Sequence, residues 1–319
     1  MINHVPGWLG EKLAREQFDL FGGKEFKSYM PTSRAETKVR LYDAPRKLLG
    51  RDLTCYPQRI GSCVAHGMKH ALEFLQCLEI LNGDAEQFKH ISTAYLYGCG
   101  RVFVGGGQLG CNSDGSLGYW QAEAVMKYGV LPMSELLPGK TEDEIAQWLV
   151  SDADWSNRNT QTGNLERQFG CRTGPPADLV EKAKKHLIKG HKRVNTIEDF
   201  INSISALAPV TIASNVGYEM QARNGVHRRS GRWDHQMMGV AYDQKSETAV
   251  IQNSWGPDAH GKLYDFDDND PLPPGCLRVS FNDLAVMLAQ GDSHSINLFD
   301  GYEDRTRILN KNSFKIFGA

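Results

Sequence analysis

Apolar side chains after Ser62 recur every three or four residues, which is the spacing of one face of an α-helix. They are Val64, Ala65, Met68, Ala71, Leu72, Leu75 and Leu78. The pattern predicts a long buried helix with Cys63 in its first turn. Similar spacing predicts helices over residues 92–102 and 119–128, so the first half of the chain is predicted to be mainly helical.

Short apolar runs dominate the last third of the chain and predict strands at residues 210–213, 237–242 and 248–251. The last two are separated by a five-residue polar turn that suits a hairpin. His235 enters one strand of this hairpin and Asn253 leaves the other. We therefore expect these two side chains to meet at the same end of the hairpin.

Two further segments are polar or interrupted. Residues 132–193 contain several glycines and prolines and predict two helices, around 142–149 and 178–189. Residues 1–50 are amphipathic until Gly22-Gly23 breaks the pattern, and we expect an extension rather than a part of the core. Its apolar face would contain Trp8, Leu9, Leu13, Phe18 and Phe21.

Composition and charge limit the kind of partner. The chain has 319 residues, 40% of them apolar, which allows a substantial core. The formal net charge of -2 argues against nucleic acid or a membrane surface as partner. The N-terminus lacks a basic stretch followed by an apolar one, and no run approaches the roughly 18 apolar residues of a membrane span. We expect a cytoplasmic protein, with virion association or non-classical export left open.

The cysteines suggest chemistry rather than a disulfide framework. There are seven, at positions 55, 63, 77, 99, 111, 171 and 276, too few for a disulfide scaffold. A reducing compartment is the simpler interpretation, although three pairs and one free nucleophile would also account for the number. The absence of any Cys-x-x-Cys pair argues against a zinc site, and we expect no bound metal.

Cys63, His235 and Asn253 together are what a thiol nucleophile requires. Cys63 follows Gly61-Ser62 and opens the predicted helix, where the helix dipole favours a thiolate. The imidazole of His235 can take the thiol proton, and the amide of Asn253 can orient the ring without adding a negative charge. The three side chains predict nucleophilic catalysis by Cys63.

The motifs Gly61-Ser62-Cys63, Asp234-His235 and Asn253-Ser254-Trp255-Gly256 resemble those of the papain-like (C1) cysteine peptidases. Cys63 lies 172 residues before His235 and 190 before Asn253, whereas the family separation is about 130 to 150. The excess predicts an insertion, much of it in residues 132–193. Weaker resemblances at residues 91–97, 110–115 and 275–279 extend the likeness over about residues 51–304.

The resemblance implies a papain-like α+β fold with the active site in a cleft between two subdomains. The expected parts are an N-terminal extension (1–50, inhibitory or docking on a partner), a helical subdomain (51–130), an insertion or crossover (131–195), a β-rich, barrel-like subdomain (196–304) and a tail (305–319). The implied activity is hydrolysis of peptide bonds in peptides or proteins through a thioester, as a cysteine endopeptidase without a cofactor. Gly115 would admit extended substrate backbone, Asp234 would line the cleft rim, and Trp255 would cover the catalytic residues.

Three departures from the family pattern matter. Pro57 stands where the family has the glutamine of the oxyanion hole, and Gln58 is one residue closer to Cys63. We expect a shortened loop to aim Gln58 at the hole. Val64 replaces the aromatic residue of the plant and lysosomal members, which favours a bacterial or viral branch. Residues 257–260 lack the second Trp-Gly, which predicts a thinner apolar cover over the site.

Several alternatives remain open. His66 lies one helical turn after Cys63 and is a second candidate base. Residues 105–110 match G-x-G-x-x-G but open no helix at once, and residues 265–276 begin like a calcium loop without its glycine or its final glutamate. The same Cys-His chemistry also serves amidases, cell-wall peptide hydrolases and transpeptidases. A catalytically degenerate scaffold with a binding role is the non-enzymatic alternative.

Overall fold

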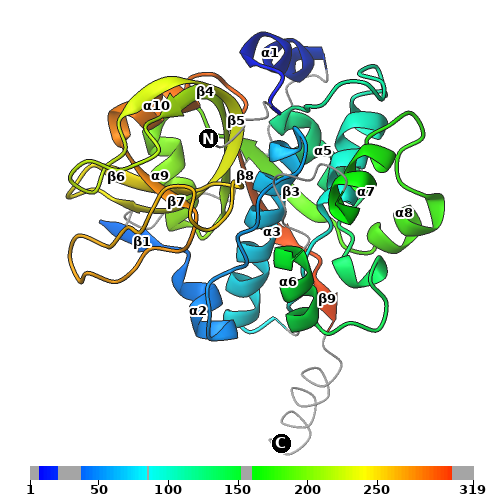
Figure 1. Cartoon of the computed structure of the whole chain (residues 1–319), viewed down its shortest axis with the longest axis horizontal. Coiled ribbons are helices and arrows are strands. Elements are labelled where there is room, and N and C mark those ends of the chain that lie inside the picture. Colours follow the sequence, from blue (N-terminus) through cyan, green and yellow to red (C-terminus); the bar gives the residue numbers. More distant parts are fainter. Residues whose placement is uncertain (1–6, 21–36, 85, 152–159, 304–319) are drawn as a thin grey trace, which may run out of the picture.

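The computed structural model describes residues 7–20, 37–84, 86–151 and 160–303. Figure 1 shows a half made mainly of helices beside a half built on a sheet, with the long helix α3 between them. The helices are α1 (Glu11–Leu20), α2 (Asp43–Leu49), α3 (Cys63–Leu81), α4 (Thr93–Gly98), α5 (Gly118–Lys127), α6 (Glu142–Ser151), α7 (Gln161–Phe169), α8 (Ala177–Ala183), α9 (Ile197–Ser205) and α10 (Phe281–Leu288). A π-helical turn (Cys99–Val104) continues α4, and a 3-10 turn covers Met133–Glu135.

The main sheet has seven antiparallel strands in the order β3-β8-β4-β5-β6-β7, with β1 also pairing with β5. The strands are β1 (Lys38–Arg40), β3 (Ile188–Arg193), β4 (Val210–Tyr218), β5 (Arg229–Asp243), β6 (Thr248–Gln252), β7 (Cys276–Ser280) and β8 (His294–Phe299). A small second sheet pairs β2 (Glu86–Gln87) with β9 (Tyr302–Glu303). The predicted hairpin is β5 and β6.

Helix α3 forms the centre of the core because it is buried on nearly every side. A Cβ atom on Gly67 would lie 3.1 Å from the side-chain nitrogen of Gln236 and 3.4 Å from the carbonyl oxygen of Met237, both in β5. The missing side chain therefore lets α3 approach β5 closely. The Gln236 side chain also donates a hydrogen bond to the Val64 carbonyl over 3.1 Å, so the first turn of α3 is fixed to the sheet.

Most of the predicted elements are confirmed, with two differences in the middle of the chain. The helix predicted over 178–189 is wrong after Ala183, because residues 188–193 form β3 and pair with β8. Helix α7 was not predicted at all. Its hydroxyl N-cap, Thr160, accepts a bond from the Gly163 N–H.

Residues 38–49, which the sequence analysis placed in the extension, pack as part of the body. β1 pairs with β5, and Leu41 and Tyr42 are buried in the main core. Basic side chains of this segment also bind the acidic loop 265–270. The ion pairs are Lys38 with Asp265 and Asp267, Arg40 with Asp268, and Arg46 with Asp270. These aspartates are thus neutralised by basic side chains, which argues against the calcium alternative.

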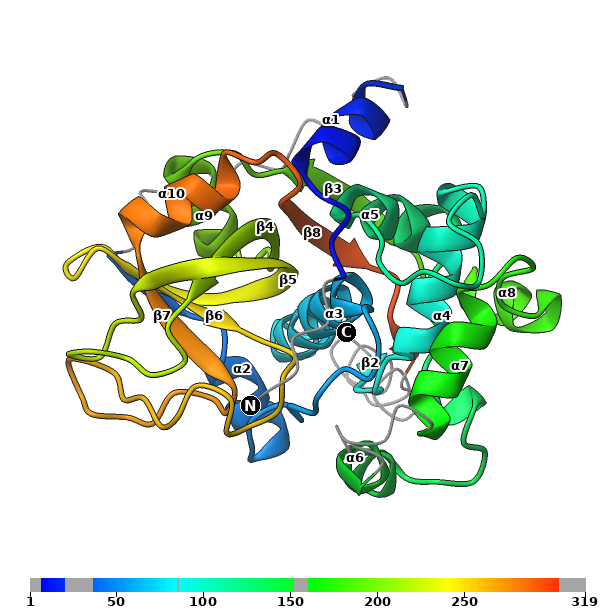
Figure 2. The ribbon, with the colours of Figure 1, turned by 45° about the horizontal axis from the view of Figure 1, so that its top comes forward.

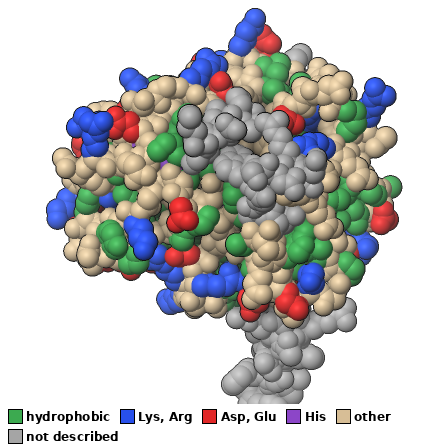
Figure 3. Space-filling view, in the orientation of Figure 1, with side chains coloured by type: hydrophobic (Ala, Val, Ile, Leu, Met, Phe, Trp, Pro, Cys, Tyr) green, Lys and Arg blue, Asp and Glu red, His purple; other side chains and the backbone are tan. Residues whose placement is uncertain are grey.

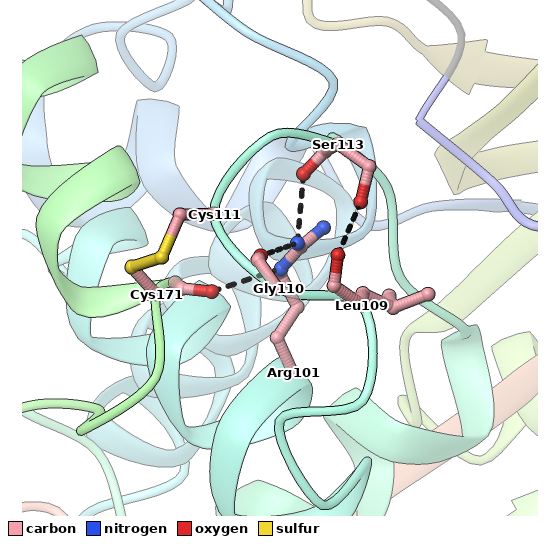
Figure 4. Close-up of a disulfide and its surroundings, with 7 residues drawn as sticks. Arg101, Leu109, Gly110, Cys111, Ser113 and Cys171 are labelled. Atoms are coloured by element: carbon pink, nitrogen blue, oxygen red, sulfur yellow. Dashed lines mark hydrogen bonds between the residues drawn. A yellow bond between two sulfur atoms is a disulfide. The ribbon is translucent and has the colours of Figure 1, made fainter.

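One disulfide, Cys111–Cys171, ties the loop before Gly115 to the turn just after helix α7 (Figure 4). The buried guanidinium of Arg101 lies inside this loop and donates to the carbonyls of Gly110 and Ser113 over 2.9 and 2.7 Å. The other five cysteines are free and buried. One disulfide and five free thiols differ from both alternatives, seven thiols or three pairs. The cellular compartment stays a prediction.

Glu79, near the end of α3, gives the fold a testable pH dependence. Its carboxylate accepts the Phe299 N–H over 3.0 Å, and burial, followed by the charges of Glu86 and Asp84, raises its pKa to about 8. The folded chain then keeps a proton that the unfolded chain loses above its ordinary pKa of 4.5. Stability must therefore fall as the pH rises from about 4.5 to about 8.

We expect Glu79→Gln to raise the free energy of unfolding at pH 8 by roughly 1–3 kcal/mol and to change it little at pH 4. Urea unfolding at the two pH values measures the difference. Glu181→Gln, at an exposed glutamate of α8, is the matched control. An equal effect of Glu79→Gln at both pH values would contradict this assignment.

Candidate active site

Cys63 is the first residue of α3, as predicted, and its side chain is fully buried. The backbone N–H groups of Val64 and Gln236 act on the sulfur in the direction that favours the thiolate. Gln236 directly follows His235 in β5, so the backbone group that contacts the sulfur belongs to the residue next to the predicted base. Ser62 does not cap the helix with its hydroxyl, which instead donates to Glu166 over 2.8 Å.

His235 and Asn253 form the hydrogen bond that the sequence predicted. The Nε2 atom of His235 lies 2.7 Å from Oδ1 of Asn253, and both side chains are buried. Their positions follow from the hairpin, because His235 lies in β5 and Asn253 directly follows β6. An amide oxygen can only accept, so Nε2 donates, and Nδ1 is the ring nitrogen left for proton exchange with a thiol.

Aromatic rings cover this pair. The Trp255 ring lies 4.7 Å from the His235 ring, and the Trp233 ring packs edge-on against Trp255 at 4.6 Å. The ring of His260 lies 6.1 Å from Trp255 and 5.9 Å from Trp233. Trp233 and His260 thus pack with Trp255 around His235, and whether this cover is thinner than that of the family stays a prediction.

Gln58 lies in the loop that packs on the segment after Asn253. Its backbone N–H donates to the Ser254 carbonyl over 2.8 Å, and its side-chain oxygen accepts the Ser254 hydroxyl over 2.7 Å. Its side-chain nitrogen donates to the Ile60 carbonyl over 2.9 Å. That nitrogen carries a second hydrogen, which is the one the predicted oxyanion role would use.

Gly115 and Asp234 flank the residues that lie over Cys63. Gly115 has φ +105°, a conformation that favours glycine, and a Cβ atom there would lie 2.8 Å from the Leu9 side chain. Asp234 has φ +48°, which is uncommon for a residue with a side chain. This conformation occurs where the Asp234 carbonyl accepts hydrogen bonds from the N–H groups of both Gly7 and Trp8, over 3.1 and 3.0 Å.

Residues 7–20, which we call the arm, therefore begin directly over Cys63. A Cβ atom on Gly7 would lie only 2.6 Å from the Cys63 sulfur and from the Gly61 carbonyl oxygen. Ser116 donates its N–H to the Gly7 carbonyl over 2.8 Å and accepts the Leu9 N–H over 3.1 Å. Figure 2 shows this segment running from α1 between the two halves toward the start of α3.

Trp8 anchors the arm in the body. Its side chain is only 4% exposed, and its indole N–H donates to the Asp292 carboxylate over 2.7 Å. Asp292 also accepts the backbone N–H groups of Gly118 and Tyr119 at the start of α5, over 2.8 and 2.7 Å. Further along, Phe18 packs edge-on against Tyr119 at 5.5 Å. Phe21, also assigned to this face by the sequence, lies outside the described residues.

The surroundings of the Cys63 thiol disfavour its charged form. Burial is the main cause that raises the pKa of Cys63 to about 12, and the charge of Asp234 acts in the same direction. The backbone N–H groups offset only part of this effect. The expectation of a thiolate-rich Cys63 is therefore wrong for the covered arrangement, because desolvation outweighs the helix dipole.

His66, the alternative base, has another partner. Its Nε2 atom lies 3.2 Å from Glu166, a fully buried carboxylate that also accepts the hydroxyls of Ser62 and Thr93. Glu166 belongs to α7, in the predicted insertion, so this helix supports the turn that contains Cys63. Sequence reasoning missed Glu166 and Asp292, because each binds groups that are far away in the chain.

No cluster of three or more His, Cys, Asp or Glu side chains suited to a metal ion occurs among the described residues. Within the same part of the chain, none of the helices is both long and apolar enough to cross a membrane.

Residues 105–110 lead into the disulfide loop and not into a helix, which argues against the dinucleotide motif. Basic and acidic side chains are interspersed over the face seen in Figure 3.

Comparison with known proteins identifies the fold. No family model matches the sequence, and no curated protein does either. Solved structures do match. Xylellain, a cysteine protease from Xylella fastidiosa, is 18% identical with a TM-score of 0.57, covering 86% of this chain and 91% of that one. The ragweed pollen allergen Amb a 11, a cysteine protease in its proform, is 16% identical with a TM-score of 0.54, covering 92% and 77%.

Procathepsin B from Trypanosoma congolense is 13% identical with a TM-score of 0.52, covering 94% of this chain and 86% of that one. At these identities the likeness shows the fold alone. The chain has the papain-like cysteine protease fold, so the predicted α+β class is confirmed.

Because the arm covers the Cys63 sulfur, its removal should change the rate at which Cys63 reacts with iodoacetamide. Trp8→Ala removes a buried indole and its bond to Asp292, and we expect it to speed alkylation of Cys63 by roughly tenfold or more. Trp8→Phe keeps an apolar ring but loses the N–H, so a smaller increase is expected. Mass-spectrometric peptide mapping gives the rate, with Cys77 and Cys276 as internal references.

Trp148→Ala, which removes a tryptophan from α6, is the matched control for this measurement. It is expected to leave the rate at Cys63 unchanged. If Trp8→Ala also leaves that rate unchanged, residues 7–9 do not restrict access to the thiol.

Proposed function

We propose that the protein is a cysteine endopeptidase that hydrolyses peptide bonds with Cys63, His235 and Asn253, and that its own arm holds it inactive. The observation that carries the proposal is the hydrogen bond between His235 Nε2 and Asn253 Oδ1 in a papain-like fold whose helix α3 begins with Cys63. The backbone N–H of Gln236, the residue after His235, contacts the Cys63 sulfur. The bond sets the ring nitrogen opposite Asn253 to serve the thiol.

In the proposed reaction the thiol proton moves from Cys63 to Nδ1 of His235. The thiolate then attacks the carbonyl carbon of the scissile bond, and Nδ1 returns the proton to the leaving amine as the C–N bond breaks. A water molecule gives a proton to His235 and attacks the thioester, which releases the acid and restores the thiol. Asn253 keeps the ring oriented through both steps.

The negative oxygen formed in each attack needs hydrogen-bond donors. We assign this role to the backbone N–H of Cys63 and to the second amide hydrogen of Gln58, which the bonds to Ile60 and Ser254 hold in place. The Ser116 backbone and the Asp234 carbonyl, now bonded to the arm, are the groups proposed to hold extended substrate backbone beside Gly115. Trp255 shields the His235–Asn253 bond from water.

Inhibition by the arm rests on Gly7 and Trp8. Gly7 covers the sulfur, and the burial it contributes to keeps the thiol protonated, so the same contact blocks substrate and weakens the nucleophile. Two of the similar structures are a proform and a procathepsin, which supports this assignment of residues 7–20. Docking of the arm on a separate partner is the alternative role for this segment.

The natural partner is then a peptide or protein and not a nucleic acid, in line with the near-neutral charge. We keep the cytoplasm as the proposed location and the bacterial or viral branch as the proposed origin of the sequence. Neither affects the tests below.

Digestion of a peptide library by the full-length Trp8→Ala chain tests the activity. We expect cleavage that Cys63→Ala and His235→Ala abolish, whereas Asn253→Ala leaves a measurable remainder because the ion pair still forms in a poorly oriented state. Cleavage that persists in Cys63→Ala would refute the proposed nucleophile. Turnover of simple amides or transfer to amines, without hydrolysis of peptides, would favour the amidase or transpeptidase alternative, and no turnover at all would favour the scaffold.

Gln58 has its own kinetic signature. Because the oxyanion exists only once attack has begun, we expect Gln58→Ala to lower kcat by on the order of a hundredfold with little change in KM. Steady-state kinetics on one cleaved peptide measures both constants. Gln76→Ala, at a buried glutamine of α3 bonded to the Lys89 backbone, controls for the loss of a buried amide. Unchanged kcat in Gln58→Ala would remove Gln58 from the oxyanion hole.

A further inference from the structure

The amide of Asn253 is held at both ends. Its oxygen accepts from His235 Nε2 and from the Ser254 N–H, over 2.7 and 2.6 Å. Its nitrogen lies 2.8 Å from Nε2 of His260. His260 belongs to the segment that departs from the family pattern, and the mechanism above gives it no role.

The direction of each hydrogen bond follows from chemistry. An amide nitrogen only donates, so Nε2 of His260 must be the unprotonated acceptor. The amide oxygen then faces His235, where Nε2 must carry the hydrogen. This arrangement leaves Nδ1 of His235 without a proton and able to accept one from a thiol. A reversed amide would place its N–H groups against His235 Nε2 and move the ring hydrogen to the wrong nitrogen.

The surroundings of His260 keep it an acceptor. The side chain is 1% exposed, and burial is the main cause that lowers its pKa to about 3, with the neighbouring His227 acting in the same direction. The Met220 carbonyl opposes this shift only in part. The rings of Trp233, Trp255 and His227 pack around it and carry no negative charge that would favour imidazolium.

We propose that His260 is a positioning residue that fixes the orientation of the Asn253 amide and, through it, the tautomer of His235. Ser254 supports the same orientation from the oxygen end, and His260 supplies the acceptor at the nitrogen end. The effect on turnover rests on the proposed peptidase function. The effect on the His235 tautomer does not, and this separates the two tests.

The kinetic test uses the full-length Trp8→Ala chain. His260→Phe keeps an aromatic ring beside the two tryptophans but offers no acceptor, and we expect kcat to fall by roughly ten- to a hundredfold with KM within about twofold. His260→Gln supplies an acceptor oxygen and is expected to recover most of the loss. In an Asn253→Ala background, His260→Phe should cost nothing further, because the amide it acts on is gone.

The tautomer itself is read from the ring nitrogens of His235 by ¹⁵N NMR in the Cys63→Ala chain, above the pKa of the ring. We expect the Nε2–H tautomer with His260 present, a mixture in His260→Phe, and recovery in His260→Gln. His227→Phe, at a buried ring that packs on His260 at 5.4 Å but does not bond Asn253, is the matched control and should leave the tautomer unchanged.

An unchanged tautomer in His260→Phe would reduce His260 to a packing role and overturn the proposal. If that variant does not fold, His260→Leu, which also lacks an acceptor, takes its place in both tests. A chain that cleaves no peptide yet shows the tautomer change would refute the peptidase function and keep the role of His260.

Discussion

The close packing of α3 on β5 fixes the helix that begins with Cys63 against the strand that contains His235. A side chain at Gly67 would make a tight contact with Gln236, and one turn earlier the Gln236 amide binds the Val64 carbonyl. Because Gln236 follows His235 in β5, the same contact that joins the two halves also fixes the strand that contains His235 relative to the start of the helix. A large residue at position 67 would require Gln236 and β5 to move away from α3.

Burial at this junction has opposite effects on the two parts of the site. It strengthens the His235–Asn253 bond, since Trp255 and Trp233 keep water from it. It also makes the thiolate of Cys63 costly, since a charge without water is destabilised. The arm increases that second effect by covering the sulfur. Departure of the arm would therefore restore both access to the thiol and the solvation of its charge.

Local patterns in the sequence predicted the helix and the hairpin that position Cys63, His235 and Asn253. The helical spacing after Ser62 placed Cys63, and the polar turn between two apolar runs placed His235 and Asn253 at one end of a hairpin. The pattern failed at residues 184–189, where the pairing of β3 with β8 outweighs the local helical tendency. The buried position of Trp8 could not be predicted from the sequence, because its indole binds Asp292, which is 284 residues away.

The roles of Asn253 and His260 show how neutral groups can orient the imidazole of the proposed ion pair. Forming the thiolate and imidazolium already puts two charges in a buried place, and a further charge nearby would favour one partner and disfavour the other. An amide orients His235 without a charge, and an imidazole kept neutral by burial orients the amide in turn. A protonated His260 would both lose its acceptor and repel the imidazolium. Orientation is thus passed from His260 through Asn253 to His235 by hydrogen-bond direction alone, without a charged side chain in this series.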